Sequence, residues 1–183
     1  MGREVRRVPP NYVHPVWTKE DAPRRELIGQ ERSFRDQHYH DARREWIEGF
    51  MKWEAGTHPG LEHAVGTEMD WWEWYGYPPD RAYYRPWRDD EATWFQLWQN
   101  VSEGSPVSPP FATEEELIQY LAANGDFWDQ KREKDWNVKP RPNGWGDAAA
   151  RAFVNAGGAP SLMVKGGVMF DSRDIPLALK KEK

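Results

Sequence analysis

The sequence contains no cysteine, which excludes disulfides, thiolate zinc sites and cysteine nucleophiles. This absence fits a reducing compartment. The sequence also lacks any apolar run near the roughly 20 residues of a membrane-spanning helix, and its first residues include no hydrophobic signal core. We therefore expect a cytoplasmic protein that has no membrane partner.

Aliphatic side chains are scarce as well. Apolar residues make up 38% of the 183 residues, against a usual figure of roughly 45–50%. Twelve Trp, seven Tyr and seven Phe compensate, because each aromatic side chain buries about 150–250 Å². We expect a core dominated by rings, with further rings at a groove or an interface. The length predicts a single domain over residues 1–183.

The net charge of −5 is unevenly distributed along the chain. Residues 1–44 carry +3 and residues 130–183 carry +5, whereas residues 45–100 carry −7 and residues 101–129 hold six acids and no base. Either the basic ends neutralise the acidic centre, or one basic face binds an anion such as a nucleotide. Bulk duplex DNA is not an expected partner, because phosphate neutralisation supplies most non-specific affinity.

Apolar spacing and capping residues predict the helices. They lie at about 33–55 with Ser33 as the N-cap, at 61–74, from Thr113 to a stop at Asn124–Gly125, and at 145–155. Residues 129–143 form a polar stretch without a predicted element.

Alternation predicts a central strand at 92–101, and the prolines after Val8 predict a short edge strand before them. Apolar runs on both sides of Gly166–Gly167 predict a β-hairpin. The fold is therefore expected to be α+β, with three or four helices packed on a small antiparallel sheet. We expect an irregular, inserted segment at about 55–80 and a frayed tail after about 177.

The stretch from Trp94 to Phe111, W-F-Q-L-W-Q-N-V-S-E-G-S-P-V-S-P-P-F, joins an aromatic strand to a turn rich in Ser and Pro. Its hydroxyls either face a ligand or close turns with the backbone. Glu103 is the one carboxylate in this loop, so it is either an acid/base group or an acceptor that fixes the loop's shape.

A second candidate lies in the Y-Y-R-P-W run from Tyr83 to Trp87, with Arg81 just before it. Rings beside guanidinium groups offer stacking and cation–π surfaces to a nucleotide. The alternative is that the Arg stems pack over rings at the edge of the core. Together the two segments supply the candidate ligand-binding residues: Arg81, Tyr83, Tyr84, Arg85, Trp87, Trp98, Glu103, Ser105 and Ser108.

Metal and nucleophile signatures are missing from the sequence. On the predicted helix, His38 and His40 diverge by about 200° and do not share an ion. The spacing of His58 and His63 matches no zinc pattern, and no serine lies in a G-x-S-x-G elbow. We predict no metal, no cofactor and no assigned catalytic residue, while an enzyme that uses Glu103 stays open.

Four blocks, R-R-V-P-P-N-Y-V-H-P-V-W, Y-R-P-W, F-Q-L-W-Q-N-V-S-E-G-S-P-V-S-P-P-F-A-T-E-E-E-L and G-G-A-P-S-L-M-V, resemble an uncharacterised family of tailed-bacteriophage and prophage proteins with an S-E-G-[ST]-P-[IV]-S-P core motif. The chain departs from that pattern at Pro110 and at Gly158. The matching positions are Arg7, Val8, Pro9, His14, Pro15, Pro86, Trp87, Ser102, Glu103, Gly104, Ser105, Pro106, Ser108, Pro109, Thr113, Leu117, Ala159, Pro160 and Ser161.

The resemblance implies a phage-encoded protein that acts in the cytoplasm of the infected host cell, and it implies no catalytic residues. The first hypothesis is a non-catalytic counter-defence protein that sequesters a nucleotide-derived signal. The alternative is a protein–protein inhibitor of a host defence or housekeeping enzyme, acting through a Trp-rich acidic surface between residues 67 and 98. A small nucleotide-acting enzyme and a minor virion component are further options. A homo-oligomer stays open.

Overall fold

The computed structural model describes residues 2–63, 69–100, 104–135, 144–160, 162–171 and 174–180. The chain divides into two compact units, and each is described by itself. Unit 1 comprises Met1–Ser33 and Trp87–Lys183, and unit 2 comprises Phe34–Pro86. Unit 2 includes the segment at about 55–80 that the sequence marks as irregular. Within the described ranges, no helix is long and apolar enough to cross a membrane.

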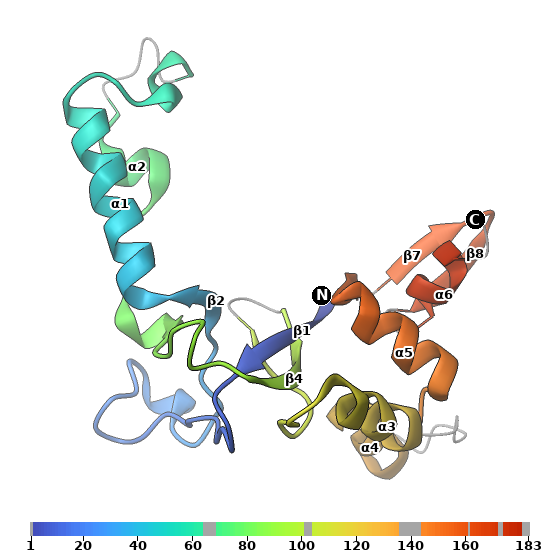
Figure 1. Cartoon of the computed structure of the whole chain (residues 1–183). Coiled ribbons are helices and arrows are strands. Elements are labelled where there is room, and N and C mark those ends of the chain that lie inside the picture. The colour runs from blue at the N-terminus through green and yellow to red at the C-terminus, as the bar shows by residue number, and fades with distance from the viewer. Residues whose placement is uncertain are drawn as a thin grey trace. The chain divides into compact units, whose positions relative to one another are not determined.

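Unit 1 contains a four-stranded antiparallel sheet in the order β5-β4-β1-β6. Its two longest strands, β1 and β4, lie side by side (Figure 1). The strands are β1 (Gly2–Val8), β4 (Trp94–Gln99), β5 (Ser105–Pro106) and β6 (Gly158–Pro160). The predicted central strand is confirmed, since β4 lies between β5 and β1. The predicted edge position of β1 is wrong, because the prolines follow Val8 and leave the strand's own donors free to pair on both sides.

The capped helix at Thr113 is confirmed as α3 (Glu114–Asn124). Thr113 Oγ1 accepts from the Glu116 N–H at 3.2 Å, and Glu116 Oε2 accepts from the Thr113 N–H at 3.2 Å. This reciprocal pair satisfies two donors that the helix start leaves open. The Ala-rich helix is confirmed as α5 (Asp147–Ala156).

Helix α4 (Phe127–Asp135) occupies part of the stretch for which the sequence predicted no element. Asp126 Oδ1 accepts from the Asp129 N–H at 2.9 Å, and Asp129 Oδ2 accepts from the Asp126 N–H at 3.2 Å. The buried Asp126 carboxylate also forms an ion pair with Arg3 of β1. Burial raises the pKa of Asp126, while the charge of Arg3 opposes the rise. The sequence did not predict α4 because its start depends on two aspartates that cap each other and on an arginine distant in the sequence.

The predicted hairpin is confirmed as β7 (Leu162–Lys165) paired antiparallel with β8 (Val168–Asp171). Gly166 and Gly167 both adopt positive φ, 56° and 77°, as a two-residue hairpin turn of this kind requires. Helix α6 (Ile175–Lys180) follows, so the tail predicted to fray after about 177 begins inside a helix.

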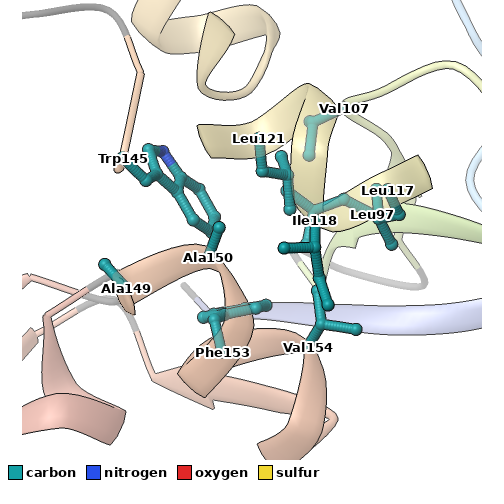
Figure 2. Packing of buried hydrophobic residues seen from close by; sticks show 10 residues of the cluster. All are labelled: Leu97, Val107, Leu117, Ile118, Leu121, Trp145, Ala149, Ala150, Phe153 and Val154. Carbon is teal, nitrogen blue, oxygen red and sulfur yellow. The ribbon is translucent and has the colours of Figure 1, made fainter. Parts of the chain in front are cut away.

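The main core of unit 1 lies where α3 and α5 pack against β4 (Figure 2). Only two of its ten buried residues are rings, so the prediction of a ring-dominated core does not hold here. The alanines of α5 allow its backbone to come close to α3, and aliphatic side chains fill the remaining space. The ten residues are Leu97, Val107, Leu117, Ile118, Leu121, Trp145, Ala149, Ala150, Phe153 and Val154.

Unit 2 begins with β2 (Arg35–His38), which pairs parallel with β3 (Tyr84–Arg85), and continues into α1 (Tyr39–Glu54). The predicted helix is therefore confirmed, but its start at Ser33 is wrong: His38 is the N-cap. Residues 35–38 are held extended by pairing with a strand almost fifty residues later. The predicted helix at 61–74 is also wrong as one element. It is replaced by the 3-10 helix η2 (Pro59–Glu62) and by α2 (Trp71–Tyr75), which starts at a capping box between Asp70 and Glu73.

Helix α2 is tied to α1 at both of its ends. The Trp46 indole N–H donates to the Gly76 carbonyl at 2.9 Å, and the Trp53 indole N–H donates to the Met69 carbonyl at 3.2 Å. Between them the Trp71 ring lies against Gly49 of α1, where a Cβ would be 2.5 Å from the ring. Rings dominate this core, as the composition predicts, with Trp53 and Trp71 buried.

Gly49 lies so close to the Trp71 ring that a larger side chain at this position should destabilise the protein. In an exposed helix interior, Gly→Ala stabilises by about 1 kcal/mol. In Gly49→Ala the new methyl would overlap the Trp71 ring, and overpacking costs about 1–3 kcal/mol. We expect a lower free energy of unfolding in a denaturant titration. The matched control is Glu48→Ala, at an exposed position of the same helix, which should change stability by no more than about 0.5 kcal/mol. A Gly49→Ala variant more stable than the parent would contradict this packing.

Candidate functional site

The predicted ligand-binding residues are divided between the two units. Arg81, Tyr83, Tyr84 and Arg85 belong to unit 2, whereas Trp87, Trp98, Ser105 and Ser108 belong to unit 1. Glu103 lies outside the described residues.

The serine hydroxyls are used inside unit 1. Ser108 Oγ accepts from the Leu97 N–H at 2.9 Å and donates to the Pro109 carbonyl at 2.9 Å. Ser105 Oγ accepts from the Gln99 side-chain amide at 3.0 Å. Both serines are buried. They join the loop after β4 back onto that strand, so neither hydroxyl is presented to solvent as a ligand donor.

Trp87 and Trp98 are also buried. They belong to a group of contacting side chains that we call the Tyr12 cluster: Arg6, Tyr12, His14, Trp87 and Trp98. The Tyr12 ring lies edge-on to Trp87 with centroids 4.7 Å apart, and the His14 ring lies edge-on to Trp98 at 5.1 Å. The Arg6 guanidinium lies 4.7 Å from the centre of the Trp98 ring. Sequence reasoning missed Tyr12 and His14 as members of this group, although the H-P pair of the first resemblance block contains His14.

A chain of hydrogen bonds sets the protonation state in this cluster. His14 Nε2 lies 2.5 Å from the Arg32 carbonyl oxygen, and because a carbonyl only accepts, Nε2 carries a proton. Nδ1 of the neutral ring then accepts from the Tyr12 hydroxyl at 2.8 Å. Burial lowers the pKa of His14, and the charges of Arg6 and Arg32 add to this, while the bond to the Arg32 carbonyl opposes it. Burial, and then Glu31, raises the pKa of Tyr12. The two groups are neutral partners that pin the 12–14 segment to residue 32.

In unit 2, three of the four candidates contact side chains of β2 or of the first residue of α1. The Arg35 guanidinium lies 5.4 Å from the centre of the buried Tyr84 ring, and Arg35 Nη1 donates to the Tyr84 hydroxyl at 3.3 Å. Arg85 Nε lies 3.4 Å from Asp36 Oδ1. The exposed Arg81 lies with its guanidinium 5.8 Å from the centre of the Tyr39 ring. Sequence reasoning missed Arg35 and Tyr39, which supply two of these contacts. We call Arg35, Tyr39, Arg81, Tyr84 and Arg85 the Arg/Tyr group. Tyr83 is half-buried at the end of the 3-10 helix η3 (Arg81–Tyr83).

The argument that His38 and His40 diverge on a helix is wrong, because His38 precedes α1. The two ring centroids lie 5.2 Å apart. His38 Nδ1 is 3.3 Å from Asp41 Oδ2. Among the residues that the structure describes, no three His, Asp or Glu side chains form a group that could hold a metal ion.

The most exposed aromatic region is on unit 2. We call it the α2 surface: Trp72, Trp74, Tyr75 and Tyr77, whose exposed fractions are 42%, 37%, 56% and 83%. Trp74 stacks on Trp53 with centroids 5.8 Å apart and lies against Gly60. Tyr75 stacks on the buried Trp71 at 4.6 Å. Two of the four rings are thus held in place by internal stacking while more than a third of each side chain faces solvent.

Carboxylates accompany these rings. Between Glu45 and Asp80 the sequence has eight acids and a single base, Lys52. Glu62 of η2, the N-cap Asp70 and Glu73 of α2 are all exposed. Within the described ranges, none of these three carboxylates forms an ion pair with a basic side chain. The α2 surface is therefore both aromatic and negatively charged.

No family model matches the chain, and comparisons with curated proteins and with solved structures gave no significant match. The resemblance to a phage family stays a prediction.

The state of His14 generates a pH prediction. The pKa of His14 in the folded protein lies below its ordinary value of 6.5. Below pH 6.5 the unfolded chain therefore binds a proton at His14 more readily than the folded protein does, and this favours unfolding. We expect the free energy of unfolding to decline as the pH falls through 6.5, and His14→Gln to reduce that slope. His40→Gln, at an exposed position, serves as the control and should keep the parent slope. Equal slopes for the parent and His14→Gln would rule out the assigned role.

Proposed function

We propose that this is a non-catalytic binding protein that recognises a partner protein through the α2 surface. The observation that carries the proposal is the exposure of four large rings within six residues, two of them fixed by stacking on rings of the unit 2 core. Trp and Tyr are the residues that most often dominate binding energy at interfaces. Monomeric soluble proteins rarely gather so many exposed rings without an interaction role.

Stacking makes these rings effective binding groups. Immobilising a flexible side chain on binding costs about 0.5–1.5 kcal/mol. Trp74 and Tyr75 are already held against Trp53 and Trp71, so most of that cost has been met on folding. Trp72 and Tyr77 add two further exposed rings, one before and one after this pair in the sequence.

The resemblance to a phage family extends the proposal to a host protein as the partner. In that setting the protein is an inhibitor of a host defence or housekeeping enzyme. This extension rests on the resemblance, whereas the binding role rests on the α2 surface.

A second candidate is the sequestration of a nucleotide-derived signal by the Arg/Tyr group of unit 2. The observation that favours it is the exposed Arg81 guanidinium over the Tyr39 ring, an arrangement on which a base and a phosphate can both find partners. It ranks second because Trp98, Ser105 and Ser108 are buried and contact other parts of unit 1. An enzyme that uses Glu103 has no support from the described residues.

The protein-binding role is tested by affinity capture from a lysate of the bacterial host. The parent protein should retain one stoichiometric partner, and Trp72→Ala/Tyr77→Ala should weaken its retention at least about tenfold, the effect of losing a single hot spot. Neither ring stacks on the core, so the variant should keep the parent Tm. Met51→Ala, which removes an exposed apolar side chain of the same unit, should bind as the parent does. A partner retained equally by all three proteins would contradict the proposal, and so would the absence of any partner.

The nucleotide role is tested by calorimetric titration with cyclic and ADP-ribose-derived nucleotides. Binding heat that disappears in Arg81→Ala would support it, and Arg88→Ala, at an exposed position of unit 1, is the matched control. No heat with any of these nucleotides would remove this candidate.

A further inference from the structure

We infer that the α2 surface binds a cationic segment of its partner, a stretch of chain rich in arginine. This inference rests on the proposed protein-binding role and specifies the chemistry of the partner. Three exposed carboxylates accompany the rings. Asp70 and Glu73 belong to the N-cap and first turn of α2, which carries three of the rings, and Glu62 belongs to η2, whose Gly60 lies against Trp74.

Burial of these carboxylates decides between an apolar and a cationic partner. A purely apolar partner that covers the rings would also remove water from the neighbouring acids, and an unpaired buried charge costs several kcal/mol. A cationic partner supplies the missing counter-charge. Between Glu45 and Asp80 the sequence has eight acids and one base, Lys52, and within the described ranges none of the three carboxylates forms an ion pair with a basic side chain.

The rings favour the same partner. The faces of Trp and Tyr carry negative potential and attract guanidinium and ammonium groups, with energies of about 0.5–2 kcal/mol per contact. The protein uses this interaction elsewhere: Arg32 lies 4.4 Å from the centre of the Trp17 ring and Arg6 lies 4.7 Å from that of Trp98. In both pairs the arginine also reaches a carboxylate, Asp21 and Glu4 respectively. A ring with an adjacent acid is therefore an arrangement that this chain already fills with arginine.

Arginine fits better than lysine for a geometric reason. Its planar guanidinium stacks on a ring while its N–H groups donate to a carboxylate, whereas the ammonium of lysine is a compact, strongly hydrated charge. Nucleic acids and anionic membranes do not fit, because their phosphates would be repelled by the uncompensated acids. The occupant is thus a protein segment with arginines spaced to meet both rings and acids.

The test uses the full chain and three synthetic peptides, an alternating Arg–Ala peptide and its Lys–Ala and Glu–Ala counterparts, followed by tryptophan fluorescence. We expect the Arg–Ala peptide to bind most tightly, the Lys–Ala peptide more weakly and the Glu–Ala peptide not at all, with affinity falling as salt rises. Glu62→Gln/Glu73→Gln should weaken Arg–Ala binding about tenfold. Glutamine at position 73 still accepts from the Asp70 N–H, so the capping box of α2 is retained.

The matched control is Glu26→Gln/Glu114→Gln, which makes the same change in net charge at exposed positions of unit 1. It should bind as the parent does. Equal weakening in both double variants, equal binding of Arg–Ala and Glu–Ala peptides, or no binding of the Arg–Ala peptide would each overturn the inference. If lysate capture through the α2 surface succeeds while the Arg–Ala peptide fails, the protein-binding role stands and the cationic partner falls. If the peptide binds and no protein is captured, the cationic site stands and the broader role falls.

Discussion

The indole N–H is a donor that loses water on burial, and hydrogen bonds from such groups hold elements together in both units. The ring contributes a large apolar area, but an unpaired buried donor costs about 1–3 kcal/mol. In unit 2 the acceptors for Trp46 and Trp53 are the backbone carbonyls on either side of α2, so satisfying two donors of α1 also fixes the second helix. In unit 1 the buried indoles of Trp98 and Trp145 donate to side chains of Gln96 and Asp129. The buried Trp71 N–H of unit 2 is an exception, with no hydrogen-bond partner among the described residues.

The elements that could be predicted from the sequence are those whose signals are local. Helix α3 has its capping box and the β7–β8 hairpin has its two glycines within a few residues of the structure they produce. The errors have distant causes. Residues 35–38 match the polarity of a helix, yet they pair with Tyr84–Arg85. Strand β1 is interior because β6, from the far end of the chain, covers its second side. Composition predicted ring-rich packing correctly for unit 2 and wrongly for the α3–α5 core of unit 1, since it carries no information on where the rings gather.

The candidate residues show the same limit. A run such as Tyr83–Trp87 indicates rings next to guanidinium groups, but burial decides whether they can meet a ligand, and burial depends on partners such as Arg35, Tyr39 and Tyr12 that lie far away in the sequence. The Trp-rich acidic region was visible in composition. Composition did not show which of its rings face solvent, because adjacent residues of α2 have opposite environments: Trp71 is buried and Trp72 is exposed. Hydrogen-bond partners to α1 set that rotation.

The interior position of β1 has a consequence for biosynthesis. β1 is translated before both of its partners, residues 94–99 and 158–160, so its backbone donors and acceptors have no strand to pair with until those residues follow. Unit 2 is one continuous stretch, Phe34–Pro86, and all of its internal pairings are available before β4 exists. Non-local strand pairing is slow and leaves edges open to other chains. In the nascent chain, all residues of unit 2 are therefore present while the residues of β1 still have no strand partner.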